Sequence, residues 1–322
     1  MRPQNSQREV EKMITGTKVL KHLDNLMERR PVTAQIQLDN FCNNFCSYCR
    51  YVGMPAKEKR SITLDEFKEY VRILLDMGVK GFILTGGEPT LSKDFDKITA
   101  WLEENEIPYG INTNFNVLKL IKPRYLKISI DGYDADSYKA VRGIDRYETV
   151  IRNLETYLKW KKENGVKTAV GIQKLGLDIE ECRKFYEAHK HFDVDYFSFR
   201  PVESVRHSYY DTNDEKPVIA FLESLRQTDR RVQINYKYYQ IRTCFDKCYG
   251  NFLQIAVNPN GDVIYCCHKS NEIVGHLTDP DILKKIYEYD TNMETCPVPC
   301  RMTGPNALVR DMETSTNDSM FI

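Results

Sequence analysis

Residues 64–90, LDEFKEYVRILLDMGVKGFILTGGEPT, contain one repeat of the pattern that decides the fold. Apolar residues recur at spacings of three and four from Leu64 onward, which predicts an amphipathic helix that ends at Gly78. The apolar run GFILTGG (81–87) follows at once and predicts a buried strand that ends in a glycine turn. A helix that leads directly into such a strand predicts βα units around a parallel sheet.

The same alternation extends in both directions from this stretch. Further strands are predicted at 33–38, 108–114, 125–131, 167–174 and 194–202, and further helices at 95–106, 146–165 and 178–192. Six strand–helix units can be counted, fewer than the eight of a closed barrel. The sequence is therefore compatible with an open, partial barrel or with a doubly wound sheet.

The pattern changes after about residue 230. FLQIAVNPNGDVIYCC (252–267) is typical of two strands joined by an Asn-Pro-Asn-Gly turn, and the cysteines from Cys244 onward all lie in this last third. We therefore predict three parts: an N-terminal helical extension (1–32), the barrel (33–230), and a small C-terminal unit (231–322) held together by metal.

The composition excludes several classes of function. Lys plus Arg and Asp plus Glu number 46 each among the 322 residues, so the net charge is zero and general nucleic-acid binding is not expected. No apolar stretch is long enough for a signal peptide or a membrane span, so we expect a cytoplasmic protein with no membrane partner. In that reducing compartment, ten cysteines indicate metal ligands or reactive thiols rather than disulfides.

Three cysteines follow the first predicted strand in DNFCNNFCSYCRY (39–51): Cys42, Cys46 and Cys49. Ligands of βα sheets bind at the carboxyl ends of the strands, where this loop lies. A structural zinc ion needs four protein ligands, whereas three thiolates leave one position on a metal centre open. A zinc site with a distant fourth ligand is the alternative that the loop alone leaves standing.

The spacing Cys-x₃-Cys-x₂-Cys, with the aromatic Tyr48 before the last cysteine, resembles the signature of the radical S-adenosylmethionine (radical SAM) superfamily. The resemblance implies a partial (β/α)₆ barrel and a 4Fe–4S cluster on the three cysteines. It also implies that SAM binds the open iron and is cleaved to a 5′-deoxyadenosyl radical. A strongly reducing cluster, fed by an external flavodoxin-like or ferredoxin-like electron donor, is physically reasonable.

Later strand ends also resemble the family's SAM-binding motifs. TGGEPT (85–90) resembles the Gly-Gly-Glu-Pro motif that holds the SAM amino group. INTNF (111–115) and ISIDG (128–132) stand where the family places further polar contacts to SAM, and an arginine follows in AVRG (140–143). The cofactor-binding residues implied are Tyr48, Gly86, Gly87, Glu88, Thr113, Asn114, Ser129 and Arg142. For Arg142, an ordinary position on a helix surface is an equal alternative.

The C-terminal cysteines resemble the opening of a SPASM or twitch extension, which binds auxiliary 4Fe–4S clusters. Cys248 and Cys266 are separated by twelve residues, Gly261 and four more residues, and Cys296 and Cys300 follow. The further Cys-x₂-Cys-x₅-Cys run of a full SPASM domain is missing, so the resemblance implies one auxiliary cluster on these four thiolates. A zinc ribbon is the alternative for the same four cysteines.

Three residues are weaker candidates for a role in catalysis. Cys244 and Cys267 could donate a hydrogen atom or act as extra ligands, although an ordinary buried thiol is the simpler interpretation. Cys267 follows a presumed ligand on a strand, so its side chain is expected on the opposite face. Arg200 ends the sixth predicted strand, where it could meet an anionic group of a substrate.

These features predict a radical SAM enzyme, an oxidoreductase or epimerase that abstracts hydrogen from a C–H bond. Only 32 residues precede the first strand, which leaves little room for a peptide-recognition module. We therefore expect a small polar substrate, a carbohydrate or nucleotide-linked sugar, that is dehydrogenated or epimerised. A peptide-modifying enzyme and a non-catalytic zinc or electron-transfer protein are the two alternatives.

Overall fold

The computed structural model describes residues 21–49, 59–176, 178–200, 215–234, 245–296, 300 and 302–314. Within these residues one ten-stranded sheet runs in the order β10-β9-β8-β1-β2-β3-β4-β5-β6-β7. The strands are β1 (Thr33–Gln37), β2 (Gly81–Thr85), β3 (Tyr109–Thr113), β4 (Tyr125–Ser129), β5 (Ala169–Leu175), β6 (Tyr196–Arg200), β7 (Val232–Ile234), β8 (Gln254–Val257), β9 (Asp262–Ile264) and β10 (Ile273–His276).

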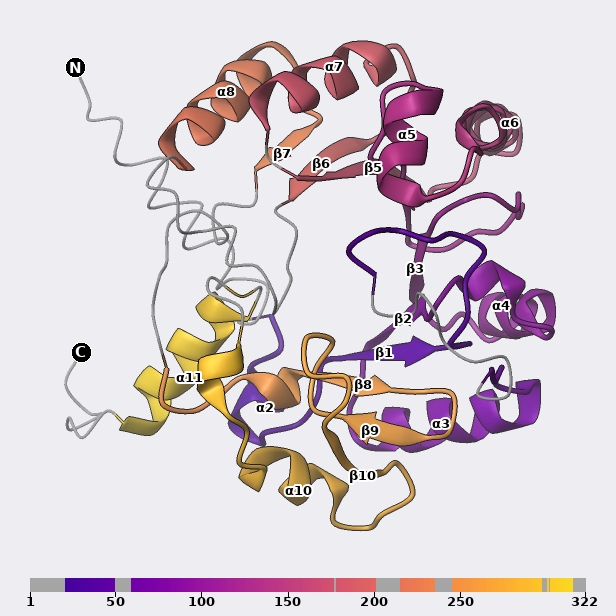
Figure 1. The fold of residues 1–322 in the computed structure, drawn as a ribbon. Helices are drawn as coiled ribbons and strands as arrows, with labels where there is room; N and C mark the ends of the chain where they lie inside the picture. The colour runs from indigo at the N-terminus through magenta and orange to yellow at the C-terminus, as the bar shows by residue number, and fades with distance from the viewer. Residues whose placement is uncertain are drawn as a thin grey trace.

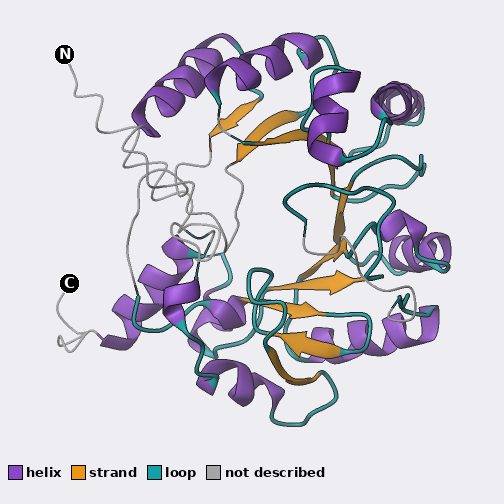
Figure 2. Ribbon diagram, viewed as in Figure 1, coloured by secondary structure: helices purple, strands orange, loops and turns teal. Residues whose placement is uncertain are grey.

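Helices α3 to α8 lie on the outer side of the curved sheet, whereas α11 lies at its open side (Figure 1; Figure 2). The helices are α2 (Leu23–Met27), α3 (Leu64–Asp76), α4 (Phe95–Glu104), α5 (Ala135–Arg142), α6 (Tyr147–Glu163), α7 (Ile179–His189), α8 (Glu215–Thr228), α10 (Ile282–Glu288) and α11 (Thr303–Thr314), with short 3₁₀ turns η2 (Pro89–Leu91), η3 (Asn251–Leu253) and η4 (Met293–Thr295). Since the helices cover one side of β1–β7 and leave the other side concave, the predicted partial barrel is confirmed and the doubly wound alternative is wrong.

The parallel part of the sheet is held by an apolar layer between strands and helices. The opening helix shows how the sequence builds it: Thr63 and Glu66 form a reciprocal capping box at the start of α3, and Phe67 and Leu74 are fully buried beneath it. Strand residues such as Ile36 and Leu84 complete the layer with no exposed surface. This burial fixes the positions of the strand ends, because a one-residue slip would turn each strand's apolar side chains away from the core.

The C-terminal hairpin is part of the same sheet. β8 pairs in parallel with β1, and β9 pairs antiparallel with β8. The predicted hairpin is therefore present, with Gly261 at a φ of 86° in its turn. The division into domains at residues 32 and 230 stays a prediction, and the sheet runs across the second boundary, because β7 pairs with β6 and β8 pairs with β1.

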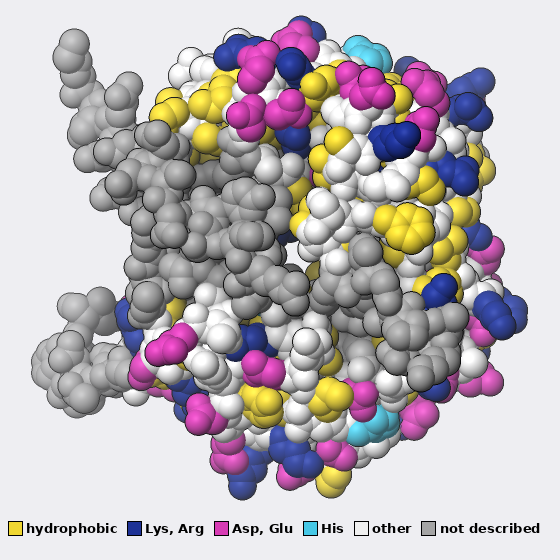
Figure 3. Space-filling model, in the orientation of Figure 1, with side chains coloured by type: hydrophobic (Ala, Val, Ile, Leu, Met, Phe, Trp, Pro, Cys, Tyr) yellow, Lys and Arg dark blue, Asp and Glu magenta, His cyan; other side chains and the backbone are white. Residues whose placement is uncertain are grey.

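The surface shows no sorting of charge by sign on the face drawn in Figure 3, where acidic and basic side chains are interspersed over the described residues. This distribution agrees with the net charge of zero. Among the helices that the structure describes, none combines the length and the apolar composition that a membrane span requires.

Candidate cofactor site

The loop that carries the three cysteines begins directly after β1 and is held by the glycine turn after β2. The N–H of Gly87 donates to the carbonyl of Asp39 at 3.1 Å, and the N–H of Glu88 donates to the carbonyl of Phe41 at 2.9 Å. A Cβ atom on Gly87 would lie 1.9 Å from the oxygen of Phe41, so only glycine permits this approach. The Gly-Gly turn therefore holds the cysteine loop in place. The approach of this turn to SAM stays a prediction.

The other side of the loop is hydrogen bonded to the end of α5. The N–H groups of Phe45 and Ser47 donate to the carbonyls of Arg142 (2.9 Å) and Val141 (3.2 Å). These carbonyls are among the last four of the helix, which have no partner inside it. Gly143 ends α5 with a φ of 68°, and a Cβ there would lie 2.5 Å from the oxygen of Phe45. The AVRG stretch therefore anchors the cysteine loop.

The thiols of this loop are surrounded by hydrogen-bond donors. The sulfur of Cys42 accepts from the backbone N–H of Asn44 at 3.4 Å and from Asn114 Nδ2 at 3.5 Å. The sulfur of buried Cys46 accepts from Arg142 Nη1 at 3.4 Å. Donors aimed at sulfur stabilise thiolates that ligate iron, so this donor set fits a 4Fe–4S cluster on the loop. Burial raises the pKa of the Cys42 thiol to about 12, so cluster binding must displace a proton.

Asparagines fix the loop from the side of β3, and of these the sequence singled out only Asn114. Asn114 Nδ2 donates to Asn43 Oδ1 at 2.7 Å, and Asn116 Nδ2 donates to Asn44 Oδ1 at 2.6 Å. The signal was present in the sequence as two asparagines after Cys42 and three more in NTNFN. Amides in pairs without a motif are too common to be assigned from one sequence.

Glu88, predicted to accept from the SAM amino group, is buried and hydrogen bonded within the protein. Its Oε1 accepts from the hydroxyls of Thr90 (2.7 Å) and Thr113 (2.6 Å), and its Oε2 accepts from the backbone N–H of Asn114 at 2.7 Å. Burial raises the pKa of Glu88. Oε2 has one protein donor, so the carboxylate retains capacity for an ammonium group and also fixes the predicted Thr113–Asn114 pair.

Tyr48 and Arg142 meet at Asp131, beside Cys46. The Tyr48 hydroxyl donates to Asp131 Oδ2 at 2.7 Å, and Arg142 Nη2 lies 2.8 Å from the same oxygen. Arg142 is buried, so its alternative as a surface residue is wrong. Burial by itself lowers the pKa of Arg142, but the charges of Asp131, Tyr48 and Cys46 outweigh it and hold that pKa well above its usual range. The guanidinium is thus a permanent positive charge next to the loop.

Asp39 is a second buried acid at this edge that the sequence did not single out. Its Oδ1 accepts from the N–H groups of Gly87 (3.0 Å) and Glu88 (3.2 Å), while its Oδ2 is buried without a hydrogen-bond partner among the described residues. Burial, followed by the nearby charge of Glu88, raises the pKa of Asp39 from 3.8 to about 8. The carboxyl is therefore largely protonated in the folded protein at neutral pH.

This raised pKa predicts a pH dependence of stability. The unfolded chain loses the Asp39 proton near pH 4 but the folded protein keeps it to about pH 8, so the free energy of unfolding falls as pH rises between them. The Asp39→Asn variant keeps the acceptor but cannot ionise. Between pH 5.5 and 7.5, urea unfolding of the cluster-free wild type should lose about 2 kcal/mol more than the variant. An equal loss in both proteins would contradict the assignment.

Of the remaining predicted residues, the structure describes Ser129, Arg200 and Cys267. Ser129 is the last residue of β4 and Arg200 the last of β6, so both lie at the carboxyl edge. Cys267 lies in a turn beyond β9 and not on a strand. The argument from strand alternation, which placed its side chain on the face opposite to that of Cys266, is therefore wrong. Cys244 lies outside the described residues. The roles of these residues stay predictions.

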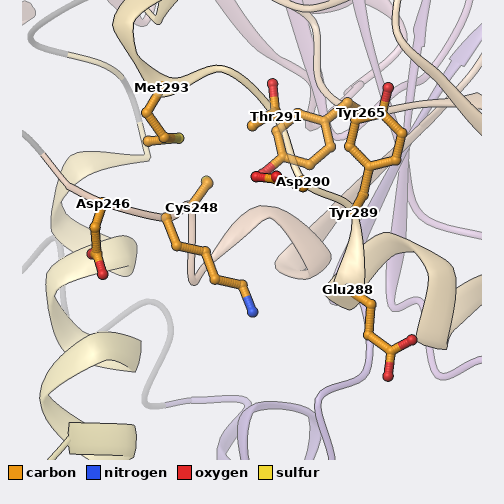
Figure 4. A pocket seen from close by; sticks show the side chains of 9 residues that line it. Asp246, Cys248, Tyr265, Glu288, Tyr289, Asp290, Thr291 and Met293 are labelled. Atoms are coloured by element: carbon orange, nitrogen blue, oxygen red, sulfur yellow. The ribbon is translucent and has the colours of Figure 1, made fainter.

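The four C-terminal cysteines line one small cavity. Cys248, Cys266, Cys296 and Cys300 surround it together with Tyr265. A second cavity of about 230 Å³ shares Cys248 and Tyr265 with it. In this second cavity, shown in Figure 4, the rings of Tyr265 and Tyr289 lie 5.2 Å apart between centroids. Burial raises the pKa of Cys248 to about 12, and the convergence of four thiols fits the ligand set of a closed cluster.

The comparisons with known proteins place the barrel in a family. Residues 36–188 match the sequence profile described as the Radical SAM superfamily. A GTP 3′,8-cyclase of Pasteurella multocida is 28% identical over 200 residues, which are 57% of this chain and 56% of the relative. A probable GTP 3′,8-cyclase of Thermococcus kodakarensis is 32% identical over 139 residues, 41% of this chain and 45% of the relative. The chain thus spans about half the length of these curated relatives.

Solved structures share the fold over more of the chain. Streptococcus suis SuiB, in a crystal structure bound to the precursor peptide SuiA, has a TM-score of 0.65 and 18% identity over 84% of this chain and 69% of SuiB. Native anSMEcpe with bound AdoMet has a TM-score of 0.61 and 20% identity, and the match covers 83% of each chain. At these identities the likeness concerns the fold.

The expected reaction is corrected by these relatives. We expected dehydrogenation or epimerisation of a carbohydrate or nucleotide-linked sugar, but the curated relatives are named as cyclases of GTP. The expectation failed because it used the short N-terminal segment to choose a substrate, although the cysteine and glycine motifs bind only the cofactor. The radical SAM core that the cysteine loop predicted is retained. Residues 36–188 of this chain are a radical SAM domain.

Proposed function

We propose that the chain is a radical SAM enzyme whose substrate is a purine nucleoside triphosphate, with GTP as the first to test. The observation that carries the radical chemistry is the loop of Cys42, Cys46 and Cys49, fixed at the carboxyl edge with N–H donors on its sulfurs. Support for the nucleotide comes from the GTP 3′,8-cyclases that match the barrel. When bound at the loop, a 4Fe–4S cluster and SAM would supply the radical chemistry that removes a hydrogen atom from a substrate.

The residues around the loop would divide the work of holding these groups. The thiolates of Cys42, Cys46 and Cys49 would hold the cluster to which SAM binds. Glu88 offers Oε2 to the amino group of SAM, and Ser129 lies at the strand end where the ribose is expected. Arg142, fixed by Asp131, keeps a positive charge beside Cys46.

The C-terminal cysteines are proposed to hold one auxiliary 4Fe–4S cluster within a unit of residues 231–322. The support is that four thiols, those of Cys248, Cys266, Cys296 and Cys300, line a common cavity. The first and the last of these cysteines are 52 residues apart in the chain (300 − 248). A flavodoxin-like or ferredoxin-like protein is the proposed external donor.

The test uses the anaerobically reconstituted full chain, reduced with dithionite and supplied with SAM. We expect 5′-deoxyadenosine to form, and GTP to increase its rate and to be consumed in a ratio of about one to one, since each radical removes one hydrogen atom. ATP and CTP serve as controls for the base. Formation of 5′-deoxyadenosine without consumption of GTP would reject the substrate, and no 5′-deoxyadenosine at all would reject the enzyme.

A further inference from the structure

Lys269 is a buried cation in the part of the chain that carries the C-terminal cysteines. It lies in the turn between β9 and β10, where its backbone N–H donates to the carbonyl of Cys266 at 3.0 Å. Its side chain is only 5% exposed. An ammonium group has three donors, and three acceptors meet this one: Glu272 Oε1 at 3.1 Å, the carbonyl of Asn292 at 2.7 Å and the hydroxyl of Thr295. The position of the charge is therefore fixed.

The contacts of Lys269 join two segments that carry cysteines. Two of its acceptors belong to η4 and the residue that caps it, directly before Cys296. Glu272 adds a second link, since its Oε2 accepts from the hydroxyl of Thr291 at 2.6 Å. Lys269 and Glu272 therefore connect the segment that ends in Cys296 to the turn that begins at Cys266.

The connected segment also borders Cys248. Thr291 and Met293 line the cavity of Figure 4 together with Cys248. Cys296, at the end of the segment, lines the smaller cavity of the four thiols, again with Cys248. A change at Lys269 therefore reaches a segment that borders both cavities.

The charge of Lys269 acts on the sulfur of Cys296. Burial raises the pKa of the Cys296 thiol, and the charge of Lys269 is the strongest influence that opposes this rise. Four thiolates around one metal centre gather negative charge in a buried place, which is costly without a nearby cation. An apolar side chain at position 269 could fill the same space but could not offset that charge.

We propose that Lys269 is a positioning residue of the four-thiol site: it fixes Cys296 relative to Cys266, and its charge stabilises the negative centre that the thiolates form with a metal. An added electron makes such a centre more negative, so a fixed cation beside it favours the reduced form and raises the reduction potential. The inference rests on the proposed auxiliary cluster for the kind of metal centre, but not for the position of the thiols.

The experiment is a redox titration of the reconstituted full chain, followed by electron paramagnetic resonance. The signal that disappears in Cys296→Ala belongs to the C-terminal site. Lys269→Met keeps the apolar length of the side chain and removes its charge. We expect this variant to shift the equilibrium of the site about tenfold toward the oxidised form, a fall of about 59 mV for one electron.

A second variant should shift the potential in the opposite direction. Glu272→Gln keeps the shape of the side chain but leaves the ammonium charge of Lys269 without its negative partner, so the potential should rise. Shifts of opposite sign cannot come from general damage to the site. Lys285→Met is the control and should leave the potential unchanged, since Lys285 pairs with Asp279 at 3.1 Å on the surface of α10 and its side chain is 41% exposed.

The outcomes for the potential decide the inference directly. An unchanged potential in Lys269→Met, or shifts of the same sign in both variants, overturns it. If Lys269→Met does not fold, Glu272→Gln decides alone: a rise in potential supports the inference, and no change overturns it.

Failure of the proposed auxiliary cluster can be told apart from failure of this inference. If Cys296→Ala keeps all of its iron, the cluster proposal fails, and Lys269 is then tested by the binding of Co²⁺ to the cluster-free full chain. A Kd for Co²⁺ that is about tenfold higher in Lys269→Met than in the wild type supports the inference. An equal Kd, or Co²⁺ binding that does not depend on Cys296, overturns it.

Discussion

Replacing Cys46 by alanine should abolish the cleavage of SAM. Cys46 is the most buried of the three loop thiols and accepts from Arg142, and its replacement removes one of the three predicted cluster ligands. Reconstituted wild type should bind about eight irons per chain, two cubanes of four, and the variant about four. The rate of 5′-deoxyadenosine formation should fall to the background of the assay, as measured by chromatography after anaerobic incubation with SAM and dithionite.

Cys182 provides the matched control for this variant. It is fully buried in α7, its thiol lies 3.7 Å from the carbonyl of Gly176, and it belongs to neither cysteine set. Cys182→Ala should keep both the iron content and the SAM cleavage. Cys296→Ala should lose the other four irons, about half of the total, yet still form 5′-deoxyadenosine. If Cys46→Ala cleaved SAM at the rate of the wild type, this result would show that the loop does not hold the active cluster.

The second large effect is expected on stability, from the ion pair of Asp131 and Arg142. Both side chains are buried, and removal of one partner leaves the other charge without compensation. Asp131→Asn should lower the free energy of unfolding of the cluster-free protein by about 3–5 kcal/mol, measured by urea denaturation. Asp131 has a φ of 65°, a conformation that asparagine also adopts, so this variant changes the charge with little backbone strain.

A double variant distinguishes a lost ion pair from general damage. Arg142→Gln together with Asp131→Asn removes both charges, so it should be more stable than the sum of the single losses predicts. Asp136→Asn, on the exposed side of α5, is the control and should change stability by no more than about 0.5 kcal/mol. Strict additivity of the two buried substitutions would mean that the pair contributes no coupling.

The order of strands and helices could be predicted from the sequence because their signals are local. The helix ending at Gly78 and the strand after it are specified by apolar spacing and by one glycine, and both are found within a few residues of the expected bounds. The position of β8 could not be predicted in this way. Its pairing with β1 joins residues more than 200 apart in the chain, and no local pattern encodes that choice of neighbour (Gln254 pairs with Thr33).

The candidate site was predictable to the extent that its residues form a motif. Three cysteines at fixed spacing are rare enough to point to one chemistry, and the predicted Arg142 does lie beside that loop, in contact with Cys46. Asp39 could not be found in this way. The importance of Asp39 arises from its burial against Glu88, which depends on the packed sheet.

The pairing of β8 with β1 has a consequence for how this protein can be divided. β1 lies between β2 and β8, so a chain cut ahead of residue 245 would leave β1 as an open edge with unsatisfied N–H and C=O groups, a template for aggregation. β1, the strand that leads into the Cys42 loop, is thus paired on one of its two sides with the segment that carries Cys248 and Cys266. Recombination between genes could not exchange one part for another without a matching edge, so the two parts are expected to have been inherited together.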